Sequence, residues 1–175
     1  MRRLVLAVLL AVLVPFAVAN AQGGKAPTLV MTMENGGEVT IELWPDAAPN
    51  HVKRFVELVK QGFYDGQRVH RVEPKFVVQF GDPASKTKPM DDPEMGTGGT
   101  GKKLKAEFNK RPFDRGVLGM ARSNDPNSAD SQVYLMLGDA HFLNGQYTAF
   151  GKVTKGMDVV DKIRVGDRIK SIKAQ

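Results

Sequence analysis

An arginine, a phenylalanine and a glutamine stand close together in the stretch VHRVEPKFVVQFGDP, residues 69–83. The β-branched and aromatic residues of this stretch favour a strand, yet Arg71, Phe76 and Gln79 stand among them. An arginine offers a fork of donors that stays charged at any working pH, a glutamine offers an amide, and a phenylalanine offers an apolar ring. This combination can hold and hydrogen-bond a substrate, and it contains no nucleophile.

Further polar and aromatic residues follow on later predicted strands. Gln132 and Tyr134 are separated by a single residue, so their side chains point to the same face of a strand. Phe142 and Leu143 come next, in HFLNGQYTAFG. Each of these residues alone is typical of a core or a surface, and their importance lies in their occurring together.

Other chemistries find little support in the sequence. Residues 96–101 match G-x-G-x-x-G, but the strand before and the helix after that a nucleotide site requires are missing, so we expect a flexible Gly-rich loop. The three histidines are not paired at helical spacing, and residues 125–130 lack the glycine and one oxygen ligand of a calcium loop. There is no G-x-S-x-G and no cysteine, which excludes a thiol nucleophile and disulfides. We therefore expect neither a metal nor a cofactor.

The elements that must position these residues are mostly short strands. Alternating apolar residues around Asn35-Gly36-Gly37 predict a hairpin, and apolar residues at helical spacing after Pro45 predict a helix that ends near Gly62. Roughly eight strands with two helices outside predict a mainly β protein, a closed eight-stranded antiparallel barrel capped by two α-helices. The predicted strands are 28–33, 38–43, 69–72, 76–80, 116–121, 132–137, 149–153 and about 168–173, the helices are 45–61 and 156–163, and a long loop covers 83–105.

The first residues indicate export. Arg2 and Arg3 precede an apolar run over residues 4–14, and Ala19-Asn20-Ala21 is a small-x-small cleavage signal. We expect residues 1–21 to be a signal peptide that is removed after Ala21, residues 22–27 to be a polar lead-in, and residues 28–175 to be one domain. The alternative is an uncleaved N-terminal anchor. After cleavage we expect the mature protein to be periplasmic or secreted and not attached to the membrane.

The charge is mild. Two of the 25 basic residues and none of the 19 acidic ones lie in the predicted signal, which leaves a mature net charge of +4. The basic residues are scattered and have no aromatic residues between them, so we expect no nucleic-acid partner. A monomer is expected.

Three blocks of sequence, taken in order, resemble the cyclophilin family of peptidyl-prolyl cis-trans isomerases. They are VHRVEPKFVVQFGD with a following GTGG, then GVLGMARSNDPNSADSQVYL, and then FLNGQYTAFGKVTKGMDVV. The resemblance covers residues 28–173 and implies an eight-stranded barrel with two capping helices, in agreement with the predicted elements. It also implies that X–Pro bonds rotate without a cofactor or a covalent intermediate.

The resemblance assigns roles to single residues. It implies that Arg71 is the catalytic arginine, that Gln79 orients it, and that Phe76 belongs to both the catalytic set and the proline pocket. Val77 and Tyr134 depart from the family's frequent methionine and phenylalanine, and the added Tyr134 hydroxyl needs a partner or a water. The remaining implied residues are Val77, Tyr134 and Leu143 in the pocket walls, Ala121, Arg122 and Gln132 along the substrate backbone, and Phe142 and Tyr147 at the rim, where the family has tryptophan and histidine.

Two functions from different classes fit these residues. The first is an isomerase that acts on proline-containing peptides and on folding exported proteins. The second is a non-catalytic module that binds proline peptides as a chaperone. The presence of both Arg71 and Gln79 favours the enzyme. A small barrel that encloses an apolar ligand fits poorly, because the inward positions are filled with large apolar residues.

Overall fold

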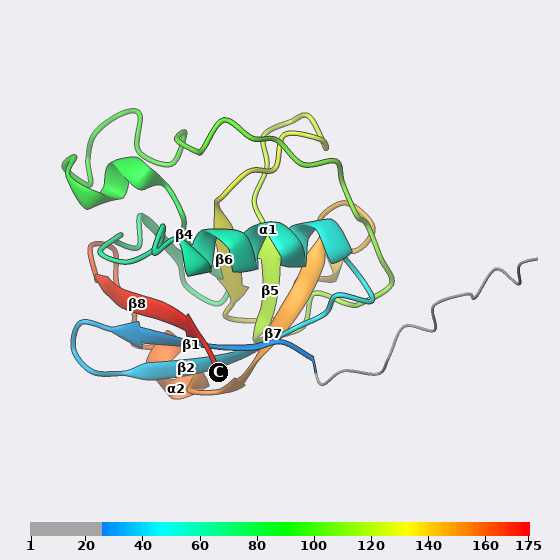
Figure 1. Cartoon of the computed structure of the whole chain (residues 1–175), viewed down its shortest axis with the longest axis horizontal. Coiled ribbons are helices and arrows are strands. Elements are labelled where there is room, and N and C mark those ends of the chain that lie inside the picture. Colours follow the sequence, from blue (N-terminus) through cyan, green and yellow to red (C-terminus); the bar gives the residue numbers. More distant parts are fainter. Residues whose placement is uncertain (1–25) are drawn as a thin grey trace, which may run out of the picture.

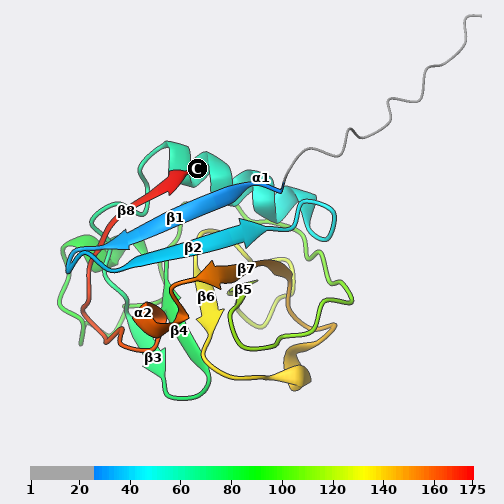
Figure 2. The same cartoon turned by 90° about the horizontal axis from the view of Figure 1, so that it is seen from below.

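The computed structural model describes residues 26–175, so the predicted signal peptide lies outside the described residues. Eight antiparallel strands form one curled sheet in the order β3-β4-β6-β5-β7-β2-β1-β8 (Figure 1). Figure 2 shows the sheet turning from β8, β1 and β2 through β7 and β5 to β6, β4 and β3. The strands are β1 (Thr28–Met33), β2 (Glu38–Leu43), β3 (Arg71–Glu73), β4 (Val77–Phe80), β5 (Val117–Met120), β6 (Val133–Met136), β7 (Ala149–Lys155) and β8 (Ile169–Ala174).

The expectation of a closed barrel is not confirmed, because β3 and β8 are the two ends of the sheet and do not pair with each other. One antiparallel bridge, between Arg68 and Arg168, joins the segments just before them. β3 has only three residues, since Pro74 cannot donate to a ladder and Lys75 turns the chain with a φ of +62°. The strands therefore form a half-barrel.

Two helices pack against this half-barrel. α1 (Pro49–Lys60) buries an apolar face, including Phe55 and Leu58, and packs against β8. α2 (Met157–Val160) has a single turn and packs against β2. Both are shorter than expected: residues 45–47 form a turn before α1, and residues 161–162 turn away after α2. Two short 3₁₀ helices, η1 (Pro83–Lys86) and η2 (His141–Leu143), were not predicted.

The sheet has apolar side chains on both faces. On the concave face, alternate residues such as Leu29, Met31 and Met33 of β1 join the main core with α1. The other face carries a second, smaller cluster that includes Val77 of β4 and Tyr134 of β6. The small cluster matters for function, because it surrounds residues that the sequence singled out.

The Gly-rich loop is fixed to the sheet by hydrogen bonds. The Asp82 carboxylate, which is fully buried, accepts from the backbone N–H groups of Gly96 at 2.7 Å and Gly98 at 3.1 Å. The Gln132 side-chain amide donates to the carbonyls of the same two glycines, each at 2.8 Å. Neither a strand before the loop nor a helix after it is present in the described chain, so this part of the sequence is not a nucleotide-binding unit.

Candidate active site

Two strands and the residue just before a third bring the arginine and the two glutamines together. Arg71 of β3 lies directly opposite Gln79 of β4, and Gln79 lies directly opposite Tyr134 of β6. Residues that are directly opposite in an antiparallel pair share one face of the sheet. Gln132, on the same face as Tyr134, is therefore within reach of Gln79. The alternation of the strands sets this arrangement. It allowed the shared face of Gln132 and Tyr134 to be predicted, whereas the pairing of Arg71 with Gln79 was implied by the family resemblance.

A chain of hydrogen bonds orients the guanidinium group. Arg71 donates through Nη1 to Gln79 Oε1 at 3.2 Å, and Gln79 donates through Nε2 to Gln132 Oε1 at 2.9 Å. Gln132 in turn donates to the anchored Gly-rich loop. The Arg71 side chain remains 45% exposed, and it lies 3.6 Å from Glu73 Oε1. Its remaining donors are thus available to a substrate.

Part of the small apolar cluster lies beside this arginine, and we take it as the candidate proline pocket. Its buried members are Val77, Phe113, Tyr134 and Leu143, and Phe76 packs at its edge. The Phe113 and Tyr134 rings are stacked with their centroids 6.1 Å apart. The Arg71 guanidinium lies 5.8 Å from the centroid of the Phe76 ring. A charged donor therefore stands directly beside a cluster of apolar side chains.

The predicted rim residues complete one side of the pocket. Phe142 is 67% exposed and stacks on Phe76, with centroids 5.8 Å apart. Tyr147 meets Tyr134 edge to face at 6.3 Å, and the Arg122 guanidinium lies 4.2 Å over the Tyr147 ring. All the residues predicted for the site are thus brought together, including Ala121, which donates its N–H to the Gln132 carbonyl at 2.9 Å.

Sequence reasoning missed Phe113. This residue is only 1% exposed, yet it stands in a loop before β5, where no periodicity marks a buried position. Its N–H donates to Asn144 Oδ1 at 2.9 Å, which ties it to the loop that carries Leu143. A large aromatic residue after a proline, in RPFDRG, was the available signal, and it is a weak one.

Two polar groups in the pocket region are buried without a hydrogen-bond partner among the described residues. The first is the Tyr134 hydroxyl, and burial raises the pKa of this side chain. The second is the His70 imidazole, both of whose nitrogens are buried, and burial lowers its pKa. Both groups are therefore held in the neutral form near pH 7, and Arg71 and Arg122 carry the positive charge of the site.

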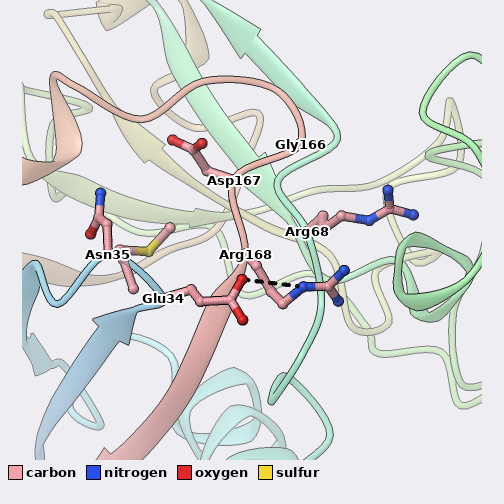
Figure 3. Close-up of a pocket in the computed structure, with 7 residues that line it drawn as sticks. Glu34, Asn35, Arg68, Gly166, Asp167 and Arg168 are labelled. Carbon is pink, nitrogen blue, oxygen red and sulfur yellow. Dashed lines mark ion pairs between the residues drawn. The ribbon is translucent and has the colours of Figure 1, made fainter.

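One cavity lies away from these residues. It has a volume of about 550 Å³ and is lined by the β1–β2 turn, Arg68 and the turn before β8 (Figure 3). Figure 3 shows Arg168 paired with Glu34, at 3.5 Å between Nε and Oε2. None of the predicted site residues lines this cavity. Its charged groups include two arginines and two carboxylates, so it has no marked preference for one sign of charge.

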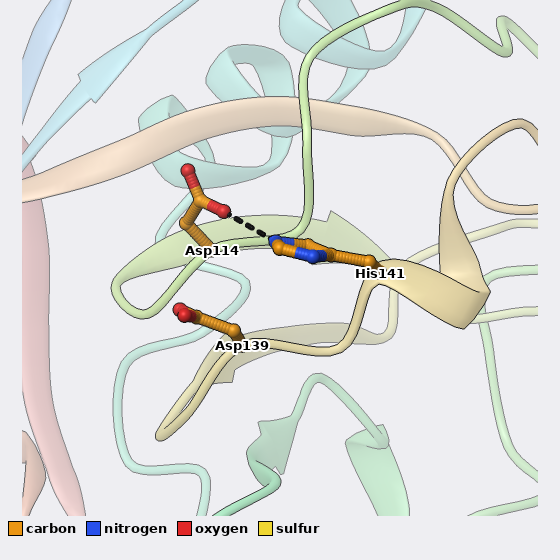
Figure 4. Close-up of side chains that lie close together, drawn as sticks. All are labelled: Asp114, Asp139 and His141. Carbon is orange, nitrogen blue, oxygen red and sulfur yellow. Dashed lines mark hydrogen bonds and ion pairs between the residues drawn. The ribbon is translucent and has the colours of Figure 1, made fainter.

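A group of possible metal ligands lies on the surface, where Asp114, Asp139 and His141 have ligand atoms within 4.8 Å of one another (Figure 4). His141 Nε2 is 2.8 Å from Asp114 Oδ1, and Asp139 Oδ1 accepts from the Arg115 N–H at 2.8 Å. These contacts satisfy the groups without an ion. Within residues 26–175 no other such group occurs.

Comparison with known proteins identifies the family. Residues 28–174 match the family model described as cyclophilin type peptidyl-prolyl cis-trans isomerase/CLD. A probable peptidyl-prolyl cis-trans isomerase of Brucella suis is 48% identical over 153 residues, which are 86% of this chain and 78% of that protein. Peptidyl-prolyl cis-trans isomerase B of Bacillus subtilis is 36% identical over 145 residues, 82% of this chain and 94% of that protein.

Solved structures show the same fold. A cyclophilin type peptidyl-prolyl cis-trans isomerase of Cryptosporidium parvum matches with a TM-score of 0.74 at 26% identity, over 86% of this chain and 98% of that one. The same protein in the presence of the dipeptide Ala-Pro matches with a TM-score of 0.73 at 25% identity, over 85% of this chain and 98% of that one. The chain belongs to the cyclophilin-type peptidyl-prolyl cis-trans isomerases.

Proposed function

We propose that the protein accelerates X–Pro rotation in folding exported proteins, with Arg71 as its catalytic residue. The observation that carries this proposal is the hydrogen-bonded chain Arg71–Gln79–Gln132 beside the apolar pocket. A half-exposed arginine would ordinarily sample many rotamers. Here Gln79 accepts from it, Gln132 fixes Gln79, and the anchored loop fixes Gln132. The guanidinium is therefore held in one place before a substrate arrives.

Rotation of an X–Pro bond requires only an oriented hydrogen-bond donor and a place that holds the proline ring. Rotation of a peptide bond meets a barrier of about 18–20 kcal/mol, because resonance stiffens the C–N bond. When the bond twists, the proline nitrogen regains a lone pair, and a donor placed there stabilises the transition state more than the ground state. The pocket formed by Val77, Phe113 and Tyr134 would hold the proline ring while the preceding carbonyl swings. Arg71 would donate to the nitrogen or to the proline carbonyl.

A protease-coupled assay on X–Pro peptides tests this proposal. We expect Arg71→Ala to lower kcat/KM by roughly 100-fold or more, the scale of a lost transition-state donor. The thermal midpoint should move by only a few degrees, because the side chain is half exposed. Arg164→Ala, which removes an exposed arginine after α2, is the matched control and should keep full activity. Near-full turnover in Arg71→Ala would show that the assignment is wrong.

The same assay separates an enzyme from a binding module. A wild-type protein that binds proline peptides in a fluorescence titration and does not accelerate their isomerisation would be a chaperone-like module. Arg71 and Gln79 support the enzyme, because a binding groove alone has no need of an oriented, partly free cation.

We also propose that the protein is exported and works as a periplasmic or secreted monomer. The support is the sequence of residues 1–21, with its two arginines, apolar run and small-x-small cleavage signal. Within residues 26–175 no helix is long and apolar enough to cross a membrane.

A further inference from the structure

A second cavity of about 520 Å³ lies next to the apolar residues of the site, because Ala121, which lines it, also packs against the small apolar cluster. Gln79 and Gln132, which orient Arg71, form one wall, and Ala121 and the Gly-rich loop form others. A substrate in extended conformation advances by about 3.3 Å per residue. When its proline lies in the apolar pocket, a side chain a few residues away therefore reaches this cavity.

The cavity is positively charged. Lys103 and Arg122 line it, and neither forms an ion pair with any residue in the described range. Arg122 donates to the Gln146 carbonyl at 3.0 Å through Nη2, a contact that fixes the group and leaves its charge uncompensated. Lys103 is exposed to solvent.

Among the described residues the lining holds one carboxylate, Asp130, and it already accepts hydrogen bonds. Asp130 accepts from the Gly101 N–H at 2.7 Å and from the Thr100 hydroxyl. The buried Arg54 side chain lies behind it, with Nη2 3.9 Å from Asp130 Oδ1. Asp130 therefore anchors the loop and is compensated by Arg54. It does not offset the charge of the two cations that face the cavity.

We propose that this cavity selects an acidic side chain in the substrate, a few residues from the proline. The inference rests on the proposed function and adds a substrate class to it. Lys103 is the specificity-determining residue, since it is exposed and forms no ion pair within the described residues, whereas the Arg122 donors are occupied. Exposed ion pairs are individually weak, so we expect a preference of roughly three- to tenfold in kcat/KM from the two cations together.

The test compares peptides that differ at one position. Sets of otherwise identical X–Pro peptides carry Glu, Gln or Lys two or three residues from the proline, on either side of it. For the wild-type protein we expect the Glu peptide of one set to exceed its Gln partner in kcat/KM and the Lys peptide to fall below it. At about 0.5 M salt the difference should shrink, because exposed charges are screened. Lys103→Glu should reverse the order of the Glu and Lys peptides.

Lys110→Glu is the matched control. It makes the same charge change on an exposed lysine of the same segment that does not line the cavity, and it should keep the wild-type order. If Lys110→Glu shifts the order as much as Lys103→Glu, the general charge of the protein is responsible and the inference is wrong.

The outcomes separate this inference from the proposed function. Equal turnover of the Glu, Gln and Lys peptides overturns the inference and leaves the isomerase assignment intact. If no peptide is turned over, the isomerase assignment fails, and fluorescence titration of the same peptides then decides the inference. Tighter binding of the Glu peptide than of the Lys peptide, reversed in Lys103→Glu, would support it, and equal binding would overturn it.

Discussion

Tyr134 places a polar hydroxyl among the apolar side chains of the pocket. Its ring packs between Phe113 and Tyr147, but its hydroxyl is buried without a partner among the described residues. The ring fits because residue 119 is a glycine, since a Cβ there would overlap the ring carbons and lie 2.6 Å from the hydroxyl oxygen. A buried hydroxyl without a partner costs free energy, so packing and not hydrogen bonding holds Tyr134 in place.

This leads to a prediction for Tyr134→Phe. Removing the hydroxyl removes a desolvation cost and keeps the stacked ring, so the free energy of unfolding should stay equal or rise by up to about 1 kcal/mol. Turnover of X–Pro peptides should remain close to that of the wild type. Urea denaturation and the isomerase assay measure the two effects. A loss of stability of more than about 1 kcal/mol would mean that the hydroxyl has a partner, such as an ordered water.

At the scale of elements, helix α1 depends on a residue far away in the chain. Its N-cap residue, Ala48, has no side chain that can accept from the first turn. The Glu107 carboxylate takes this place: it accepts from the backbone N–H groups of Asn50 at 3.1 Å and His51 at 3.0 Å. His51 Nδ1 also lies 2.7 Å from Glu107 Oε2. A carboxylate at this end is further favoured by the helix dipole.

We expect Glu107→Gln to lower the free energy of unfolding by about 1–3 kcal/mol, because it weakens charge-assisted bonds in a partly buried place. Glu38→Gln is the matched control, since Glu38 is exposed and makes no side-chain hydrogen bond in the described structure. Urea denaturation of both variants measures the difference. Equal stability of the two would show that Glu107 does not cap α1.

The strands were largely predictable, and their closure was not. β1 and β2 have the predicted bounds, because alternating residues around Asn35-Gly36-Gly37 leave little choice of register. Whether β3 and β8 pair and close the sheet depends on the length of each strand. The hydrophobic periodicity of the sequence does not indicate that length. Phe113 and Glu107 escaped prediction for a related reason. Both stand in loops, and their roles come from contacts with residues distant in the sequence.

At the scale of the whole molecule, stability should fall as the pH is lowered. Burial lowers the pKa of His51 below its ordinary value of 6.5, although Glu107 partly opposes this, and burial also lowers the pKa of His70. Below about pH 6.5 the unfolded chain therefore binds protons at these residues more readily than the folded protein does, which favours unfolding. For Glu107, burial alone would raise the pKa, but hydrogen bonds from His51 and Asn50 lower it from 4.5, so a further loss follows at lower pH.

Urea denaturation at about pH 7.5 and 5.5 tests this prediction, and between pH 6.5 and 5.5 each histidine lowers the free energy of unfolding by at most about 1.4 kcal/mol. His51→Gln should show a weaker dependence on pH, because it removes one of the two titrating groups and keeps an amide donor for Glu107. Stability that rises on acidification would contradict the neutral assignment of both histidines.

The export proposal concerns residues outside the described structure. We expect mass spectrometry of the natively expressed protein to find an N-terminus at or near Gln22, because the small-x-small signal ends at Ala21. Ala21→Leu is an informative variant, since a large residue at the cleavage site should leave the precursor uncut. An intact Met1 on membrane-bound wild-type protein would show that the segment is an anchor.

The order of the strands has a consequence for how the chain is made. β1 lies between β2 and β8, so the first strand takes one of its two neighbours from the last residues of the chain (Figure 1). Until Ile169 and Ile172 have left the ribosome, β1 has an open edge and the core beside Met31 stays uncovered. An unpaired edge and exposed apolar surface make such a partial chain prone to aggregation. We therefore expect the β1 edge of the sheet to become paired only once β8 has been synthesised.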